Sequence, residues 1–150
     1  MSLSALVLEF LDQEGWPYEE LKTHGAFRVQ IDGNTGRWPC IAVKNEAEDQ
    51  LVVYGVCPFP VIAERRIAMA ELLTRANFGL PTGSFELDLD DGELRFRTSI
   101  DFEDAVIDPK LIRNLFYINV AVMDQHLPAL EALVAGLEPK QALGQIRQPI

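Results

Sequence analysis

The sequence predicts an α+β fold in which helices pack on a largely antiparallel sheet. Apolar periodicity changes in blocks along the chain: a helix, three strands, a helix, two strands and then long C-terminal helical segments. Residues 83–100 have the pattern of a β-hairpin. The chain has 150 residues, of which 48% are hydrophobic and 24% charged, which is typical of one globular domain spanning residues 1–150.

The first helix is expected over residues 3–13. Its apolar residues recur at helical spacing, and Gly15 followed by Pro17 ends it. These residues are Leu3, Leu6, Val7, Phe10 and Leu11.

Three strands are expected next, at residues 26–32, 38–44 and 51–57. The first alternates apolar and polar residues, which predicts one buried face. The third is apolar almost throughout, which indicates a strand that is central in its sheet or covered on both faces. Residues 18–22 allow one further short strand.

A second helix is expected at about residues 61–77, after Pro58-Phe59-Pro60. Arg65 and Arg66 lie on it and could bind an anion. Because Glu64 and Glu71 flank them, surface ion pairs are the favoured interpretation.

The hairpin at residues 83–100 can be given a register from its sequence. Asp91-Gly92 is a signal for a two-residue type I′ turn, and pairing outward from it produces one apolar face and one face with opposite charges. The predicted pairs are Leu89 with Leu94, Asp88 with Arg95, Leu87 with Phe96, and Glu86 with Arg97.

A long C-terminal helix is expected to begin at Asp108-Pro109, an N-cap followed by proline. Pro128 should break or kink it, and residues 139–146 form a last short helix. The segment 115–123 is apolar nearly all the way round, so it must be covered on more than one side. Two explanations remain open: this helix forms a homodimer or docking surface, or the first or last helix covers it. The docking residues would be Leu115, Phe116, Ile118, Val122 and Met123.

The net charge and the cysteine content limit which classes of partner and which cellular compartment are expected. A net charge of −10 disfavours binding to nucleic acid or to an anionic membrane. The N-terminus reads as a helix rather than a signal peptide, and no apolar run reaches the roughly 18 residues of a membrane span, so a cytoplasmic location is expected. Cys40 and Cys57 have no metal-binding spacing; buried free thiols are expected, with a disulfide as the alternative.

No pattern in the sequence indicates catalysis, a cofactor or a metal. The acidic residues before Gly92 fail as a calcium loop, since leucines would occupy its first and third positions. His24 and His126 are isolated, and no nucleophile is placed beside either. Trp38, Phe59 and Tyr117 are candidates for an aromatic protein-contact surface, although aromatic residues of this kind more often pack in a core.

Two segments resemble the YbjN-like family. They are the hairpin Phe85–Arg97 and the helix Leu115–Leu130, supported by the terminal Pro139-Lys-Gln-Ala-Leu. The resemblance covers about residues 3–146 and implies the type III secretion chaperone-like fold and a homodimer. The family supplies no functional residue that could be assigned to a position in this sequence. Secretion chaperones of this fold are small, acidic and non-enzymatic, and they bind extended segments of client proteins.

The resulting hypothesis is a non-enzymatic, homodimeric protein-binding domain, chaperone-like or a regulatory adaptor, that holds a client segment by strand addition or in an apolar groove. One alternative is a small-molecule sensor or an undetected enzyme, with a pocket between the sheet and the C-terminal helix and with Asp124 and His126 as first suspects. The other is a subunit of a larger assembly.

Overall fold

The computed structural model describes residues 2–146, and they form an α+β structure with a six-stranded antiparallel sheet. The strands are β1 (Tyr18–Leu21), β2 (Ala26–Asp32), β3 (Arg37–Asn45), β4 (Gln50–Val56), β5 (Ser84–Leu87) and β6 (Leu94–Asp101). The helices are α1 (Leu3–Glu14), α2 (Arg66–Phe78), α3 (Pro109–Val134) and α4 (Pro139–Leu143), with short 3-10 turns η1 (Lys22–His24) and η2 (Ala63–Arg65).

The sheet has the strand order β1-β2-β3-β4-β6-β5, and every neighbouring pair is antiparallel. This confirms the predicted fold class. The optional strand at residues 18–22 forms as β1, so four strands rather than three precede α2. The prediction counted three because β1 has only four residues and lies at the edge of the sheet, where no apolar face marks it.

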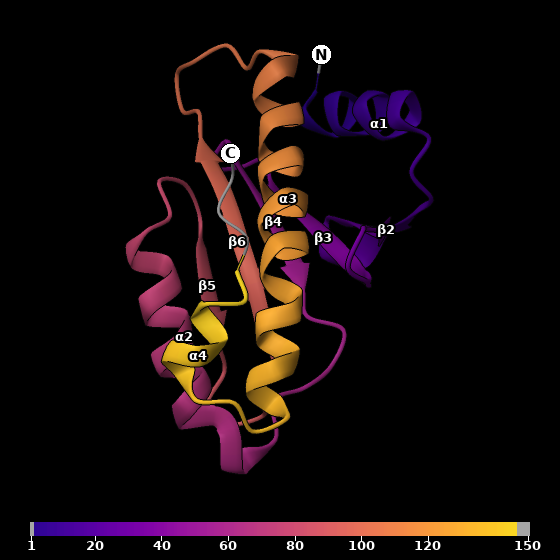
Figure 1. Ribbon diagram of the computed structural model, residues 1–150. Helices are drawn as coiled ribbons and strands as arrows, with labels where there is room; N and C mark the ends of the chain where they lie inside the picture. Colours follow the sequence, from indigo (N-terminus) through magenta and orange to yellow (C-terminus); the bar gives the residue numbers. More distant parts are fainter. Residues whose placement is uncertain (1, 147–150) are drawn as a thin grey trace.

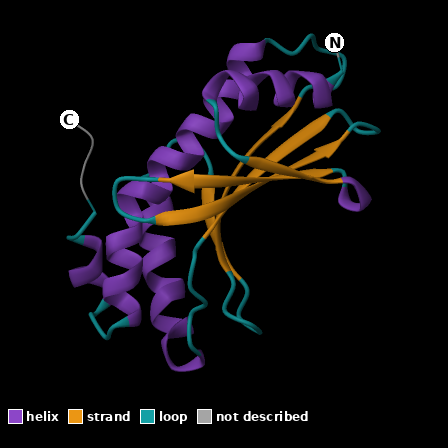
Figure 2. Cartoon of the chain, turned by 90° about the vertical axis from the view of Figure 1, so that its right-hand side faces the viewer, coloured by secondary structure: helices purple, strands orange, loops and turns teal. Residues whose placement is uncertain are grey.

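All four helices lie on the same side of the sheet (Figures 1 and 2). In Figure 1, α3 runs along the sheet, α1 crosses beside its first turns, and α2 and α4 lie together near its other end. The core fills the space between the helices and the inward side chains of the strands, including Phe27, Trp38 and Phe96. On the opposite face of the sheet, none of α1 to α4 is placed (Figure 2).

The 83–100 hairpin forms, but the predicted register is wrong by two residues. Phe85 pairs with Phe96 and Leu87 with Leu94, and Leu89 has left the strand with 55% of its surface exposed. Only Gly92 of the expected turn pair has a positive φ, at 81°, so Asp91-Gly92 is not a type I′ turn. Because the shift is an even number of residues, the side chains keep their predicted faces.

Side-chain and tertiary hydrogen bonds explain the longer hairpin loop. The Asp88 carboxylate accepts from the N–H of Asp90, and the Asp91 carboxylate accepts from the N–H of Glu93, each at 2.8 Å. The loop is also docked on the chain before α2, where the Val61 N–H donates to the Gly92 carbonyl at 2.9 Å. A Cβ on Gly92 would lie 2.1 Å from the Val61 oxygen, so only glycine allows this approach.

Among residues 2–146, Arg65 and Arg66 do not form the expected surface ion pairs. Arg65 donates at 2.9 Å to the carbonyl of Leu133, in the last turn of α3, and at 2.6 Å to the carbonyl of Leu137, just beyond it. Arg66 donates to the Val61 carbonyl at 3.0 Å and to the Asp90 carbonyl at 3.1 Å. Carbonyls at helix ends and in loops lack regular partners, and these two arginines satisfy them.

The apolar surface of α3 is covered within the chain by the other helices. α1 contacts one flank of α3, and α2 and α4 contact the other. Leu115, Phe116 and Met123 are therefore buried in the protein's own core, with 8%, 0% and 0% of their surface exposed. Of the two explanations left open by the sequence, cover by other helices of the same chain accounts for these three residues. Ile118 and Val122 are half-buried.

Pro128 does not break α3, which runs continuously from Pro109 to Val134. A proline inside a helix leaves the carbonyl four residues earlier without its N–H donor, here that of Asp124. The hydroxyl of Thr35, in the β2–β3 turn, lies 2.8 Å from this carbonyl oxygen and 2.7 Å from the Asp124 carboxylate, so its one proton is shared between them and compensates in part for the missing donor. Within residues 2–146, no helix is both long and apolar enough to cross a membrane.

Candidate functional site

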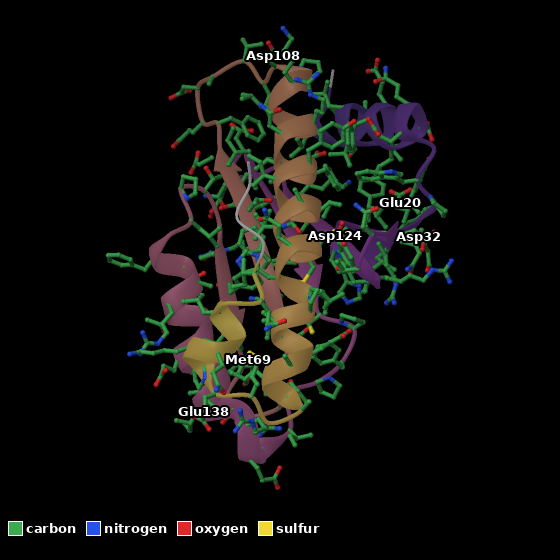
Figure 3. All side chains as sticks on the ribbon, viewed as in Figure 1. Glu20, Asp32, Met69, Asp108, Asp124 and Glu138 are labelled. Carbon is green, nitrogen blue, oxygen red and sulfur yellow. The ribbon has the colours of Figure 1, made fainter. Side chains whose placement is uncertain are left out.

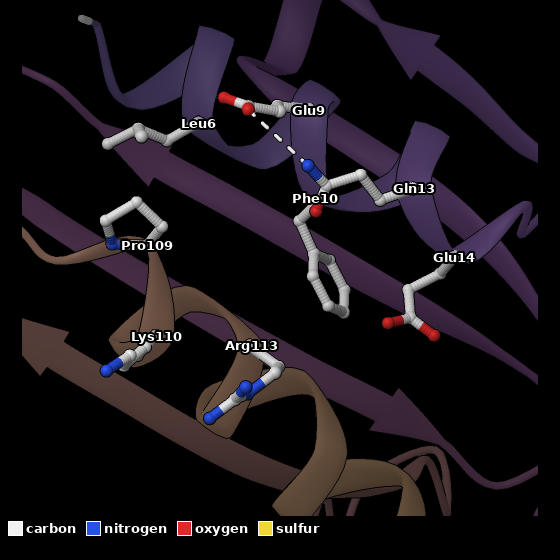
Figure 4. A pocket seen from close by; sticks show the side chains of 8 residues that line it. All are labelled: Leu6, Glu9, Phe10, Gln13, Glu14, Pro109, Lys110 and Arg113. Carbon is white, nitrogen blue, oxygen red and sulfur yellow. Dashed lines mark hydrogen bonds between the residues drawn. The ribbon is translucent and has the colours of Figure 1, made fainter.

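A groove lies between α1 and the first turns of α3 (Figure 4). It holds about 160 Å³ of free space and has an apolar floor with charged walls. From α1 it is lined by Leu6, Glu9, Phe10, Gln13 and Glu14, and from α3 by Pro109, Lys110 and Arg113.

An aromatic cluster holds α1 against α3 and so fixes the shape of this groove. The Phe10 ring stacks on Phe116 at 4.9 Å between centroids and meets Trp16 edge to face at 5.5 Å. Tyr117, 43% exposed, completes the cluster and donates its hydroxyl to Glu14. This hydrogen bond raises the pKa of Tyr117 above its ordinary value, because the carboxylate stabilises the protonated phenol.

The basic side chains of the groove lie where the helix dipole is unfavourable to positive charge. Lys110 and Arg113 lie in the first turns of α3, where the partial positive charge favours acidic residues. Neither forms an ion pair within the described part of the chain. Across the groove stand Glu9 and Glu14, so the two walls carry opposite charges (Figure 4).

A second hollow, of about 270 Å³, adjoins the first along α1. Leu6 lines both, and the side chains of the second are all apolar, while backbone atoms give it a substantial polar surface. Its other residues are Leu3, Phe102, Ala105, Val106 and Ile107, of which Val106 is 97% exposed. The two hollows share Leu6, and together we call them the α1 groove.

The three aromatic candidates from the sequence do not share one surface. Trp38 is 1% exposed and belongs to the core, so it cannot be a contact residue on the surface. Phe59 packs partly against the core in the connection between β4 and η2. Tyr117 alone lies beside the α1 groove. Sequence reasoning missed the groove itself; the signal that could have revealed it is the pair Lys110 and Arg113 at a helix start.

Asp124 and His126, the suspects for a catalytic or sensory pocket, point to different parts of the fold. Asp124 faces the β2–β3 turn (Figure 3), where its carboxylate accepts the N–H groups of Asn34 and Thr35 at 3.0 and 2.8 Å. Partial burial opposes ionisation of Asp124, but these hydrogen bonds outweigh it and lower its pKa. His126 lies on another side of α3, with its ring 4.9 Å from that of Phe85.

His126 is buried, and burial lowers its pKa below 6.5, because the charged ring would lose its hydration. Its Nδ1 donates to the Val122 carbonyl at 2.7 Å, one turn back on the same helix. His24, by contrast, is exposed in η1. The structure therefore does not bring Asp124 and His126 together into one acid–base site.

A buried polar cluster joins α3 to the middle of the sheet. The Asn119 amide donates to the carbonyls of Val53 and Phe96 at 2.9 and 3.0 Å, and its oxygen lies 3.8 Å from the Cys40 sulfur. Gly55 makes room for it, since a Cβ there would lie 2.5 Å from the Asn119 oxygen. All of these hydrogen bonds are internal, which indicates a structural role.

Cys40 and Cys57 are both free and buried. Burial is the main cause that raises the pKa of each thiol to about 12, so neither has the character of a nucleophile. In the described residues, no three side chains of histidine, cysteine, aspartate or glutamate are grouped so as to hold a metal ion.

Comparison with known proteins identifies relatives of this architecture. The family model YbjN, described as "Putative bacterial sensory transduction regulator", matches residues 4–132. A solved structure entitled "Crystal structure of YbjN, a putative transcription regulator from E. coli" superposes with a TM-score of 0.59 and 12% sequence identity, over 96% of this chain and 94% of that one. At this identity the similarity shows the fold alone. No curated protein matches the sequence.

Proposed function

The chain belongs to the YbjN family, and on this premise we propose that it is a cytoplasmic, non-enzymatic adaptor, regulatory or chaperone-like, that works as a homodimer and binds a segment of another protein. The observation that carries the proposal is the α1 groove, with its apolar floor and two cations that form no ion pair with any described residue. The family's description as a regulator is consistent with a binding role.

The groove fits an extended segment with apolar and acidic side chains. Apolar side chains of the client would enter the two hollows on either side of Leu6. Acidic side chains would meet Lys110 and Arg113, which have no competing ion pair in the described residues. Such contacts fix orientation, while the buried apolar side chains supply most of the affinity.

Strand addition is the second mode of client binding, and it would use β1 rather than β5. The outer edge of β5 is already occupied, because the Asn77 amide donates to the Phe85 carbonyl at 3.1 Å and its oxygen accepts the Phe85 N–H at 2.7 Å. β1, at the other edge, has no neighbouring strand outside it in the part of the chain that the structure describes. Its sequence Tyr18–Leu21 could pair with a client backbone.

The experiment is affinity capture from native extract with three forms of the full chain. One is unaltered, one carries Lys110→Glu and Arg113→Glu, and the control carries Lys22→Glu and Lys140→Glu, exposed lysines outside the groove with the same change in charge. Mass spectrometry should find a specific protein with the unaltered and control chains, reduced about tenfold with the groove variant. Equal recovery by all three forms, or no specific protein with any, would contradict the proposal.

A further inference from the structure

The face of the sheet that carries no helix is apolar along its two central strands. Six side chains of β3 and β4 point to this face, which we call the apolar stripe: Pro39, Ile41, Val43, Val52, Tyr54 and Val56. All six are only half-buried, and none packs against the core cluster. Figure 2 shows the helices gathered on the other side of the sheet.

The stripe departs from the usual pattern of an antiparallel sheet with one open face, in which outward residues are polar. The outer strands follow that pattern almost throughout. Their outward residues include Glu19, Arg28, Gln30, Asp32, Ser84, Glu86, Arg95, Arg97, Ser99 and Asp101. An apolar centre within a polar rim is the arrangement found in protein–protein interfaces.

This arrangement also explains the almost wholly apolar sequence of β4. Leu51 and Val53 face the helices, as the core requires, and are fully buried. Val52, Tyr54 and Val56 face the other way, where no described helix covers them; only the Arg95 guanidinium lies over the Tyr54 ring, 4.1 Å from its centroid. A strand with two apolar faces is typical of one that is covered on both.

We propose that the apolar stripe is the homodimer interface, and that its occupant is the same face of a second copy of this chain. This rests on the proposed function in so far as that function includes a homodimer. The apolar stripe takes the place of α3, the dimer surface expected from the sequence, because Leu115, Phe116 and Met123 are buried in the core.

The charge of this face selects a second copy over another partner. The chain carries a net charge of −10, so two copies repel each other over most of their surfaces. The open face is balanced: Arg28, Arg37, Arg95 and Arg97 stand against Glu19, Asp32, Glu86 and Asp101. The open faces of two copies can therefore pack together without net electrostatic repulsion. The same face has no excess charge that would select an acidic or a basic partner.

Shape and symmetry are consistent with this occupant. Two sheets pack face to face with their strands nearly aligned, about 10 Å apart, by interdigitating side chains of the size of valine and isoleucine. A two-fold axis between β3 and β4, parallel to the strands, places each β3 over the partner's β4. The β1–β2 rim then faces the partner's β5–β6 rim, which brings charges of both signs together at each edge.

The test is the mass of the full chain by light scattering and sedimentation over a range up to about 100 µM. We expect a dimer of the 16.8 kDa chain. Val52→Arg should weaken dimerisation about 100-fold, because each copy would bury an arginine without a partner against the apolar side chains of the other copy's β3. Phe78→Glu is the control, since Phe78 is an apolar residue 96% exposed on α2, and it should leave the dimer intact.

A second variant covers the case in which Val52→Arg does not fold. Ile41→Thr with Val52→Thr keeps β-branched side chains on both strands and should still weaken the dimer about tenfold. A monomer throughout the concentration range, or a dimer that neither stripe variant weakens, would overturn the inference. Client capture is measured separately. A chain that is monomeric but still captures its client would contradict only the proposed interface. A chain that is dimeric but captures nothing would contradict only the proposed client binding.

Discussion

The hydroxyl of Thr35 compensates for the presence of Pro128 inside α3, although the two residues come from different parts of the chain. It lies 2.8 Å from the Asp124 carbonyl, which has no N–H donor because residue 128 is proline, and 2.7 Å from the Asp124 carboxylate. These hydrogen bonds hold the β2–β3 turn against α3, the one described helix that has an internal proline.

Replacing Thr35 by valine should therefore destabilise the protein by about 1–2 kcal/mol, since the shape is kept and the hydroxyl is lost. The Asp124 carbonyl would be left without a protein donor. Chemical denaturation of the purified chain measures this free energy of unfolding. Thr35→Ser is the control, because it retains the hydroxyl; equal stability of both variants would show that the hydrogen bond contributes nothing.

Asn77 should protect the edge of β5 against pairing with another chain. Its side chain satisfies both outward backbone groups of Phe85. Asn77→Ala should cost about 1–2 kcal/mol of stability, even though alanine favours the helix, and should increase aggregation on mild heating. Light scattering during a thermal ramp measures the second effect. Asn114→Ala, on the exposed side of α3, should change neither, and an unchanged ramp for Asn77→Ala would contradict the protective role.

Asn119 and Gly55 should be energetically coupled. Gly55→Ala places a methyl group against the Asn119 oxygen and should cost about 1–3 kcal/mol. Asn119→Ala should cost about 2–3 kcal/mol, because the carbonyls of Val53 and Phe96 lose a donor. In the double variant the clash disappears, so the sum of the single costs should exceed the measured cost by at least about 0.5 kcal/mol. Simple additivity would refute the coupling.

The two thiols should resist modification in the folded protein. With the pKa of each raised from 9.0 to about 12, the thiolate fraction at pH 8 falls about a thousandfold, and burial restricts access further. Ellman's reagent should detect neither thiol in native buffer and both after unfolding in guanidinium. Rapid native labelling of either cysteine would contradict the buried position.

His126 should make stability fall in mildly acidic solution. Its folded pKa lies below 6.5, so as the pH drops through about 6.5 the unfolded chain takes up a proton that the folded chain does not. Stability is thus greatest above this pH and declines below it. His126→Phe, whose ring can pack on Phe85, should have a flatter profile between pH 7 and 5.5 than the unaltered chain. His24→Gln, at an exposed position, should keep the original slope; a slope unchanged by His126→Phe would assign it to other groups.

The sequence by itself determined the fold class and most element positions. Strand 26–32 and helix 3–13 were predictable because local periodicity states which residues face a core. The hairpin at 83–100 and the start of α3 at Asp108-Pro109 followed from turn and capping residues, which act over a few positions. The family resemblance is likewise confirmed.

Only the tertiary structure decided the rest, because it depends on contacts between segments far apart in the chain. The hairpin register depends on the contacts of its loop with Val61 and Arg66, rather than on a type I′ turn at Asp91-Gly92. Pro128 left α3 unbroken because Thr35, some 90 residues earlier, supplies a donor. The apolar residues of α3 went to the core and those of β3 and β4 to the open face, since a pattern along one element shows that a face is apolar but not which element covers it.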